Sequence, residues 1–289
     1  MPHIGFRCAG SVSGSGLWIW DEYEVNGSEE IEEHPRDPKI DQAKKRVRTL
    51  LDENGRSVFY IKQLQVLLEG EFFHWITGRA VGELVLEGGV GYEDAALAKG
   101  KARFVFNKAH RYRIRQIGRA VQVIERYSSP EMARACGHWA ENLFLVALAE
   151  HGFMVHERNT NAWQGRAWTQ SKHNLDFIVS RDGVTYGSEV KNTWDYIPPE
   201  EMRLKMTMCQ WLGIRPLFIW RFAPKSYMHE IIQGGGYGLI FKAHIFPLGH
   251  GGLVQEIREA LGLECDTPSR IPDGLLQRFE KWHRKVARL

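Results

Sequence analysis

Hydrophobic residues recur at helical spacing in the first third of the chain. In three successive segments the apolar side chains lie three and four positions apart, which is the period of an amphipathic helix. The segments read IDQAKKRVRTLLDENG, YIKQLQVLLEGE and FFHWITGRAVGELVLEGG, and the first is expected to end at Gly55. We expect the third helix to contribute these core positions: Trp75, Ile76, Ala80, Leu84 and Leu86.

A β-hairpin is expected after these helices. The segment GVGYEDAALAKGKARFVFNK has β-rich ends around a small, polar middle, which is typical of two strands joined by a long tip. Three helices followed by a hairpin resemble a winged helix-turn-helix domain, and the resemblance covers residues 38–113. In that family the third helix enters the DNA major groove and the wing contacts the backbone.

The winged-helix resemblance implies a nucleic-acid surface on the third helix and the hairpin. The residues implied to face nucleic acid are Thr77, Arg79, Lys101 and Arg103. The residues that do not fit such a surface, because they are acidic, are Glu83, Glu87 and Glu93. A small scaffold domain used for protein contact is therefore the alternative.

The pattern changes in the second half of the chain. Residues 114–128 are expected to form a basic connecting helix, and residues 130–152 an amphipathic helix with Pro130 in its first turn. The following segments read FMVHER, LDFIVSR and VTYGSEVK for three strands, PPEEMRLKMTMCQWLG for a helix and IRPLFIWRFA for an apolar strand. Asp182 and Gly183, between the second and third strands, are a strong hairpin signal.

These segments divide the chain into five parts. The parts are an acidic, loosely structured arm (1–37), a winged-helix-like domain (38–113), a basic connecting helix (114–128), an α/β domain (129–248) and C-terminal helices (249–289). The expected fold class is α/β, with a mixed sheet flanked by helices and preceded by a winged-helix-like α+β domain.

Three charged residues in the two central strands need partners. Asp176 begins one strand, and Glu189 and Lys191 lie two positions apart near the end of the next, so they share one face of the sheet. At about 4 Å and an effective dielectric constant near 20, two carboxylates repel by roughly 4 kcal/mol. A divalent cation removes this repulsion, and Mg²⁺ commonly takes one or two carboxylates together with phosphate oxygens. A plain cross-strand ion pair with a spare acid is the alternative.

This region resembles the PD-(D/E)XK nuclease superfamily, and most closely its archaeal Holliday-junction-resolvase-like branch. The segments that carry the resemblance are GHWAENLFLVALAEHGFMVHE, NLDFIV, GSEVKN and RPLFIW. They cover residues 130–222 and imply a restriction-endonuclease-like core with the order αβββαβ. Leu175 stands where the name of the superfamily has proline, a departure that many branches share.

The same resemblance implies roles for individual residues. The ligands of a Mg²⁺ or Mn²⁺ ion would be Asp176, Glu189 and the backbone carbonyl of Val190. Lys191 would be the catalytic lysine. Glu141 would add an acid from the preceding helix or, alternatively, cap the solvent side of that helix, and Gln210 would have a supporting role.

Charge is distributed unevenly, although the net charge is only +3. Seven acidic residues and no basic ones lie between Asp21 and Glu33. Between Lys101 and Arg126, eight basic residues stand against one acid, a local net charge of +7. The members of this run that we expect to bind nucleic acid, besides the hairpin residues, are Arg111, Arg113 and Arg115. The run is either a polyanion-binding surface or a solvated face.

A polar loop before the charged strands mixes aromatic and basic residues. Trp163 and Trp168 lie there with Arg166 and Lys172. This mixture suits stacking on bases, with core packing of the two tryptophans as an equal alternative.

Cysteine usage and hydropathy favour a reducing compartment. The four cysteines are scattered without a CxxC pair, and the first residues lack a signal-peptide pattern. No stretch approaches the ~20 apolar residues of a membrane span. We therefore expect a cytoplasmic protein without a membrane partner.

The sequence thus predicts a Mg²⁺- or Mn²⁺-dependent DNA endonuclease of restriction, junction-resolving or mobile-element type. RNA stays open as a substrate, and the resolvase-like resemblance implies a homodimer. The rival hypothesis is a non-catalytic winged-helix DNA-binding regulator that keeps a nuclease-like fold.

Overall fold

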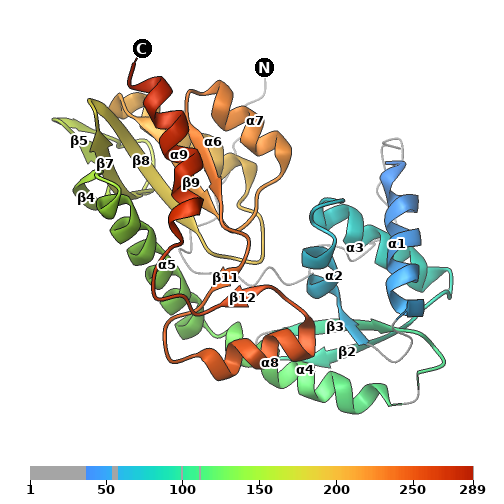
Figure 1. The fold of residues 1–289 in the computed structure, drawn as a ribbon. Coiled ribbons are helices and arrows are strands. Elements are labelled where there is room, and N and C mark those ends of the chain that lie inside the picture. The colour runs from blue at the N-terminus through green and yellow to red at the C-terminus, as the bar shows by residue number, and fades with distance from the viewer. Residues whose placement is uncertain (1–36, 54–57, 99, 111, 289) are drawn as a thin grey trace, which may run out of the picture.

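The computed structural model describes residues 37–53, 58–98, 100–110 and 112–288. Residues 1–36 of the predicted acidic arm lie outside this described part, and so does Arg111. Figure 1 shows an N-terminal unit of three helices and a small sheet beside a larger α/β unit. The predicted fold class is therefore confirmed at the level of a mixed sheet flanked by helices.

The N-terminal unit follows the predicted order of three helices and a hairpin. Its elements are α1 (Lys39–Glu53), β1 (Val58–Tyr60), α2 (Ile61–Leu67), α3 (His74–Leu86), β2 (Gly91–Ala96) and β3 (Lys101–Phe106). The short strand β1 was not predicted, because three residues are too few to show a period. It pairs antiparallel with β3, so the sheet has the order β1-β3-β2.

The core of this unit corrects two of the predicted positions on α3. Ile76, Ala80 and Leu84 are buried as predicted, because a spacing of four keeps them on one face of the helix. Trp75 and Leu86 are instead 52% and 87% exposed. Trp75 is the neighbour of Ile76 in the sequence, and one position turns a helical side chain by about 100°, so Trp75 points away from the buried face. Leu86 is the last residue of the helix.

The larger unit is built on a five-stranded mixed sheet. Its main elements are α5 (Pro130–Glu150), β4 (Met154–Thr160), β7 (Leu175–Arg181), β8 (Val184–Lys191), α6 (Pro199–Leu212), β9 (Arg215–Trp220), α7 (Lys225–Gln233), β10 (Tyr237–Ile240) and α9 (Asp273–Val286). The strand order is β10-β9-β8-β7-β4. β8, β9 and β10 are parallel, whereas β7 is antiparallel to both of its neighbours.

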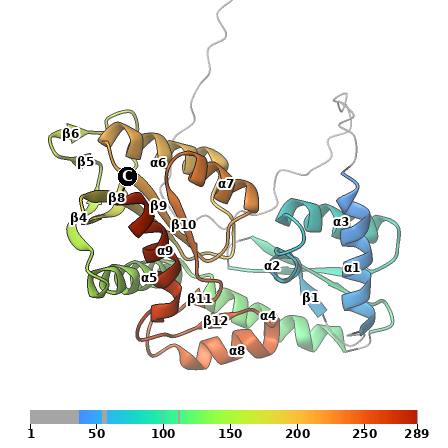
Figure 2. The same cartoon turned by 45° about the horizontal axis from the view of Figure 1, so that its top comes forward.

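Helices cover both faces of this sheet. Phe144 of α5 and Phe279 of α9 pack with Val179 on one face, and Met208 of α6 packs with Ile178 on the other. Figure 2 shows the two helix layers on either side of the strands. β8 lies between them and is buried along most of its length, as expected for a central strand covered on both faces. The helix α9, which the sequence assigned to a separate C-terminal part, belongs to this core.

The hairpin between β7 and β8 has a turn of two residues. Asp182 and Gly183 both have positive φ angles, 51° and 77°, and Arg181 pairs with Val184 across them. Two positive φ angles are the requirement of a type I′ turn, whose twist matches that of the flanking strands. This turn confirms the predicted hairpin and fixes which residues of β7 and β8 meet at its far end.

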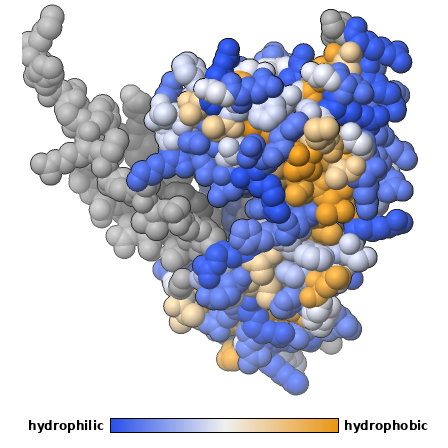
Figure 3. Space-filling model, turned by 90° about the vertical axis from the view of Figure 1, so that its left-hand side faces the viewer, coloured by the Kyte–Doolittle hydropathy of each residue, from blue (hydrophilic) through white to orange (hydrophobic). Residues whose placement is uncertain are grey.

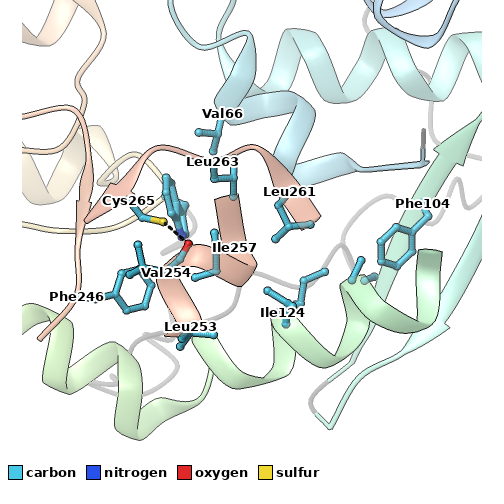
Figure 4. Packing of buried hydrophobic residues seen from close by; sticks show 14 of the residues in the cluster. Val66, Phe104, Ile124, Phe246, Leu253, Val254, Ile257, Leu261, Leu263 and Cys265 are labelled. Atoms are coloured by element: carbon cyan, nitrogen blue, oxygen red, sulfur yellow. Dashed lines mark hydrogen bonds between the residues drawn. The ribbon is translucent and has the colours of Figure 1, made fainter. Parts of the chain in front are cut away.

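A third core joins the two units. It involves α4 (Arg113–Tyr127), α8 (Gly251–Leu261) and the two short strands β11 (His244–Ile245) and β12 (Cys265–Asp266). Phe104 of β3, Ile124 of α4 and Ile257 of α8 are all buried in it (Figure 4). A further small hairpin consists of β5 (Ala162–Trp163) and β6 (Arg166–Ala167), inside the predicted polar loop.

The surface around β4 and α5 is mostly hydrophilic, with an apolar area to the right of the middle in Figure 3. β4 is an edge strand, and Met154, Val155 and the α5 residue Val146 are exposed. Among the helices that the structure describes, none combines the length and the apolar character that a membrane crossing requires.

Candidate active site

The β7–β8 ladder opens where the predicted acids lie. Phe177 opposite Ser188 is the last backbone pair, and Asp176 comes directly before it on β7. Beyond this pair the Val190 N–H donates to Asp176 Oδ2 at 2.6 Å. The side chain of Asp176 thus takes the place of a backbone acceptor, which fixes its carboxylate beside β8.

Glu189 and Lys191 meet on one face of β8, as their spacing requires. Lys191 Nζ lies 2.9 Å from Glu189 Oε1. Glu189 is buried, whereas Lys191 is about one-third exposed. The structure therefore brings Asp176, Glu189 and Lys191 together at one end of the sheet.

Two residues of α6 that the sequence analysis missed complete this cluster. Lys205 Nζ lies 2.5 Å from Glu189 Oε2 and also donates to the backbone carbonyl of Asn174. Glu201 Oε1 accepts from Lys191 Nζ at 3.0 Å. Glu201 and Lys205 lie four positions apart, so one face of α6 presents both to β8.

A signal for Lys205 was present in the sequence. The buried positions of α6 include Met202, Lys205, Met206 and Cys209, which follow the i, i+3, i+4, i+7 pattern of a core face. A lysine in that pattern is buried only when it is paired. The nearest buried acid in the preceding strand is Glu189.

Burial and charge set different protonation states within the cluster. Burial, followed by the charges of Glu189 and Glu141, raises the pKa of Asp176 to about 8, against the opposing effects of the Val190 N–H and Lys205. Burial also acts to raise the pKa of Glu189, but Lys191 and Lys205 outweigh it, and this pKa is lowered. Near neutral pH, Glu189 is therefore ionised and Asp176 retains a proton.

Lys191 is held in its charged form. Burial acts to lower the pKa of Lys191, but the carboxylates of Glu189 and Glu201 outweigh burial and raise it. An ammonium group with a raised pKa is a poor proton acceptor at neutral pH. It is suited instead to stabilising negative charge on a neighbouring group.

Of the other two predicted site residues, Glu141 lies near the cluster and Gln210 does not. Glu141 of α5 is three-quarters buried on its side chain and lies 3.6 Å from His138 Nδ1. Its charge contributes to the raised pKa of Asp176, so the structure brings it near the cluster. Gln210 is exposed on α6, five positions after Lys205 and on another face of the helix, and is not brought to the cluster.

Two carboxylates and a backbone carbonyl are the candidate direct ligands of a metal ion among the residues that the structure describes. No group of three or more His, Cys, Asp or Glu side chains with suitable placement occurs in the described ranges. Asp176, Glu189 and the Val190 carbonyl are hard oxygen donors, and Mg²⁺ sites commonly use one or two carboxylates with waters and substrate oxygens. The raised pKa of Asp176 fits this donor set, because a cation beside it would compensate the charges of Glu189 and Glu141.

The chain that follows Lys191 is anchored firmly. The Asn192 side chain donates to the Cys136 and Ile245 carbonyls at 3.1 and 2.6 Å. The buried Arg221 donates to the Thr193 carbonyl at 2.8 Å and to both carboxylate oxygens of Glu69 at 2.6 Å each. Since Glu69 follows α2, this ion pair ties the N-terminal unit to the segment beside Lys191.

The wing residues predicted to face nucleic acid are paired with acids. Arg103 donates to the two carboxylate oxygens of Asp94 at 2.6 and 2.8 Å, and Lys101 Nζ lies 3.8 Å from the same side chain. Arg113, at the start of α4, lies 3.6 Å from Glu93. Much of the positive charge on this surface is therefore compensated within the molecule.

The third helix offers little to a nucleic acid. Thr77 is fully buried, so its predicted position on the nucleic-acid surface is wrong; it belongs to the same buried face as Ile76 and Ala80. Arg79 is exposed and lies 3.5 Å from Glu83, four positions further along α3.

Two exposed arginines of α4 form ion pairs with acidic residues of α8. Arg119 lies 2.9 Å from Glu259, and Arg126 is paired with Glu256. Arg115 is exposed, and no ion pair involves it within the described part of the chain. Of the basic residues on α4, Arg115 therefore keeps its charge available to a partner.

The loop before β7 divides its aromatic and basic residues. Trp168 is buried and its Nε1 donates to Ser171 Oγ at 2.8 Å, so it packs in the core. Trp163 is partly buried and contacts His156. Arg166 is exposed and donates to the Trp211 carbonyl at 3.3 Å, and Lys172 is exposed.

The cluster of Asp176, Glu189, Lys191 and Lys205 is a preorganised arrangement of acids and ammonium groups at the open end of a sheet. Comparisons with protein-family models, with curated proteins and with solved structures return no match for this chain.

Proposed function

We propose that this protein is a metal-dependent endonuclease that hydrolyses phosphodiester bonds in DNA. The observation that carries the proposal is the convergence of Asp176, Glu189 and Lys191 at the opening of the β7–β8 ladder. Lys191 contacts Glu189 directly, and Asp176 is hydrogen-bonded to the backbone of Val190 between them. Two acids and a protonated lysine placed in this way are groups that can bind a divalent ion and a phosphate.

The element order supports the finer fold assignment. From α5 to β9 the main elements run helix, strand, strand, strand, helix, strand, which is the order of the restriction-endonuclease-like core. From α1 to β3 the order includes a short strand before α2 and a final hairpin, which is compatible with a winged helix. We propose these two folds on this order and on the segments GSEVKN and NLDFIV.

Asp176, Glu189 and the Val190 carbonyl would hold the Mg²⁺ or Mn²⁺ ion. Such an ion supplies Lewis-acid stabilisation of phosphate charge and lowers the pKa of bound water. Asp176 is kept in place by the Val190 N–H, and Glu189 by two ammonium groups. The ligands are thus oriented before a substrate binds.

Lys191 provides positive charge rather than a base. Its raised pKa keeps it protonated, and its Nζ is held between Glu189 and Glu201. Because Lys191 is about one-third exposed, it can also donate a hydrogen bond to a phosphate oxygen. Its expected role is to stabilise charge that develops on the phosphorus oxygens.

The test is a cleavage screen with duplex, branched and single-stranded DNA in Mg²⁺, in Mn²⁺ and with a chelator. The wild-type protein should cleave at least one substrate only with the metal, and Asp176→Asn should lower the rate by about 10³-fold, since metal-based charge stabilisation contributes several kcal/mol. Asp182→Asn, at the turn of the same hairpin, is the matched control and should keep the wild-type rate.

The rival regulator hypothesis predicts a different result. Sequence-specific DNA binding without cleavage in either metal, for the wild-type protein and for Asp176→Asn alike, would replace the endonuclease by a non-catalytic DNA-binding protein. Cleavage of RNA but not DNA would keep the chemistry and change the substrate.

A further inference from the structure

We infer that Lys205 of α6 is a positioning residue that sets the placement of Glu189 relative to Asp176. This inference rests on the proposed function, because it concerns how the two acids are presented to the divalent ion and phosphate. It assigns a task to a buried lysine outside the Glu-x-Lys triplet of β8.

Lys205 lies where the backbone no longer holds β7 and β8 together. The ladder ends at Phe177 opposite Ser188. Past this point Lys205 Nζ bonds to Glu189 Oε2 on β8 and to the carbonyl of Asn174, which lies two residues before Asp176. One ammonium group therefore bridges the two segments that carry the acids, and its position determines their separation.

The helix that carries Lys205 is itself fixed against the sheet. A Cβ atom at Gly187 of β8 would lie 2.8 Å from Cys209 Sγ and 2.9 Å from Ile214 Cδ1, so only glycine allows α6 to come this close. Lys205 is one turn before Cys209 on the same face. Its ammonium group is thus held by a packed helix rather than by a loop.

The two lysines contact different oxygens of Glu189. Lys191 contacts Oε1 and Lys205 contacts Oε2, at 2.9 and 2.5 Å. Glu201 gives Lys191 a second acceptor at 3.0 Å, so Lys191 stays near the site when Oε1 turns to another partner. Lys205, which is buried with Glu189, keeps Oε2 and prevents the carboxylate from rotating.

A simpler role for Lys205 is to neutralise the buried charge of Glu189. The two roles differ once a divalent ion is bound, because the ion itself supplies positive charge. A neutralising lysine becomes dispensable at saturating metal, whereas a positioning lysine does not. The decisive measurement is therefore the cleavage rate at saturating Mn²⁺, together with Mn²⁺ binding measured directly.

The variant is Lys205→Met, which has an unbranched side chain one atom shorter and carries no charge. We expect its rate at saturating Mn²⁺ to fall by about 10²-fold, as for a misplacement of about 1 Å at a reacting centre. Its affinity for Mn²⁺, from calorimetry, should be equal to or higher than that of the wild type, because a repelling charge is gone. The matched control is Arg203→Met on the exposed side of α6, whose partner is Glu230.

The outcomes separate the two roles and the proposed function. A wild-type rate for Lys205→Met at saturating Mn²⁺ overturns the inference while the endonuclease stands. If the wild-type protein cleaves nothing, the proposed function fails, and electron paramagnetic resonance of bound Mn²⁺ then tests positioning. A changed line shape in Lys205→Met supports positioning, and identical spectra overturn it.

A second variant covers the case in which Lys205→Met does not fold. Lys205→Arg keeps the charge and changes the geometry of the donor. A reduced rate with wild-type Mn²⁺ affinity supports positioning. A wild-type rate for this variant overturns it, because charge alone would then suffice.

Discussion

The cluster around Glu189 and the basic run between Lys101 and Arg126 contain the same kinds of ion pair in opposite surroundings. The side chains of Lys205 and Glu189 are 6% and 3% exposed, whereas those of Arg119 and Glu259 are 58% and 50% exposed. A surface pair contributes about 0–1 kcal/mol, but removing one partner of a buried pair costs about 3–5 kcal/mol. The buried ion pairs fix the relative positions of their side chains, and the surface ion pairs mainly compensate charge.

The largest effect expected from this difference is on stability. Arg221→Met should lower the free energy of unfolding by about 3–5 kcal/mol, because it removes the guanidinium that compensates the charge of the buried Glu69 carboxylate between the two units. Urea denaturation measures the change. Arg119→Met, which breaks a surface pair of the basic run, should cost at most about 1 kcal/mol. Equal losses for the two variants would remove the distinction between buried and surface ion pairs.

A second test uses the pH dependence of the buried cluster. The pKa of Asp176 is about 8 in the folded protein and near 3.8 in the unfolded chain, so the folded state binds an extra proton between these values. The stability that comes from the protonated carboxyl is complete below about pH 4 and is lost as the pH rises through 8. The substituted side chain of the Asp176→Asn variant cannot ionise, so this variant should not lose stability in this way as the pH rises.

Thermal melts without metal at pH 5 and pH 8 check this prediction. The melting temperature of the wild type should fall relative to that of Asp176→Asn by roughly 10 °C, since the wild type loses about 1.4 kcal/mol per pH unit over most of this range and about 1 kcal/mol shifts the melting temperature by roughly 2–4 °C. Mn²⁺ should suppress the fall, because it favours the ionised carboxylate. Parallel pH curves for the two proteins without metal would show that Asp176 ionises normally.

The smallest expected effect concerns the basic run. Arg115→Ala should reduce the slope of log K against log salt for DNA binding by about 0.9, the value for one phosphate contact. Arg119→Ala should leave the slope unchanged, since Glu259 already compensates its charge. Binding measured between 50 and 200 mM salt, by fluorescence anisotropy, separates the two. Identical slopes for both variants would mean that internal pairing does not decide which arginines bind DNA.

The two regions also differ in how far the sequence predicted them. Asp176, Glu189 and Lys191 could be brought together from local rules alone, because strand alternation and the Asp182-Gly183 turn fix their register. The partners of Arg126 and Arg119 could not be predicted, since Glu256 and Glu259 lie 130 and 140 residues away from them in the sequence. Counting charges along the chain therefore overstated the positive surface.

The remaining differences have similar causes. Glu201 and Lys205 reach the cluster only through the docking of α6 on β8, which no local pattern specifies, although a lysine on the core face of α6 was a usable sign. Trp75 was predicted to lie in the core because it is large and apolar, but its neighbour Ile76 faces the interior and Trp75 faces the solvent. The strand β1 exists only because β3 provides a partner for it.

The core shared by Phe104, Ile124 and Ile257 has a consequence for how the molecule can be taken apart. These residues come from the N-terminal hairpin, the connecting helix and a helix near the C-terminus. Expression of either half by itself would expose a large hydrophobic surface to water, and we expect such fragments to aggregate. A protease that cuts between the halves should leave them bound together, and heating should melt the whole in a single step.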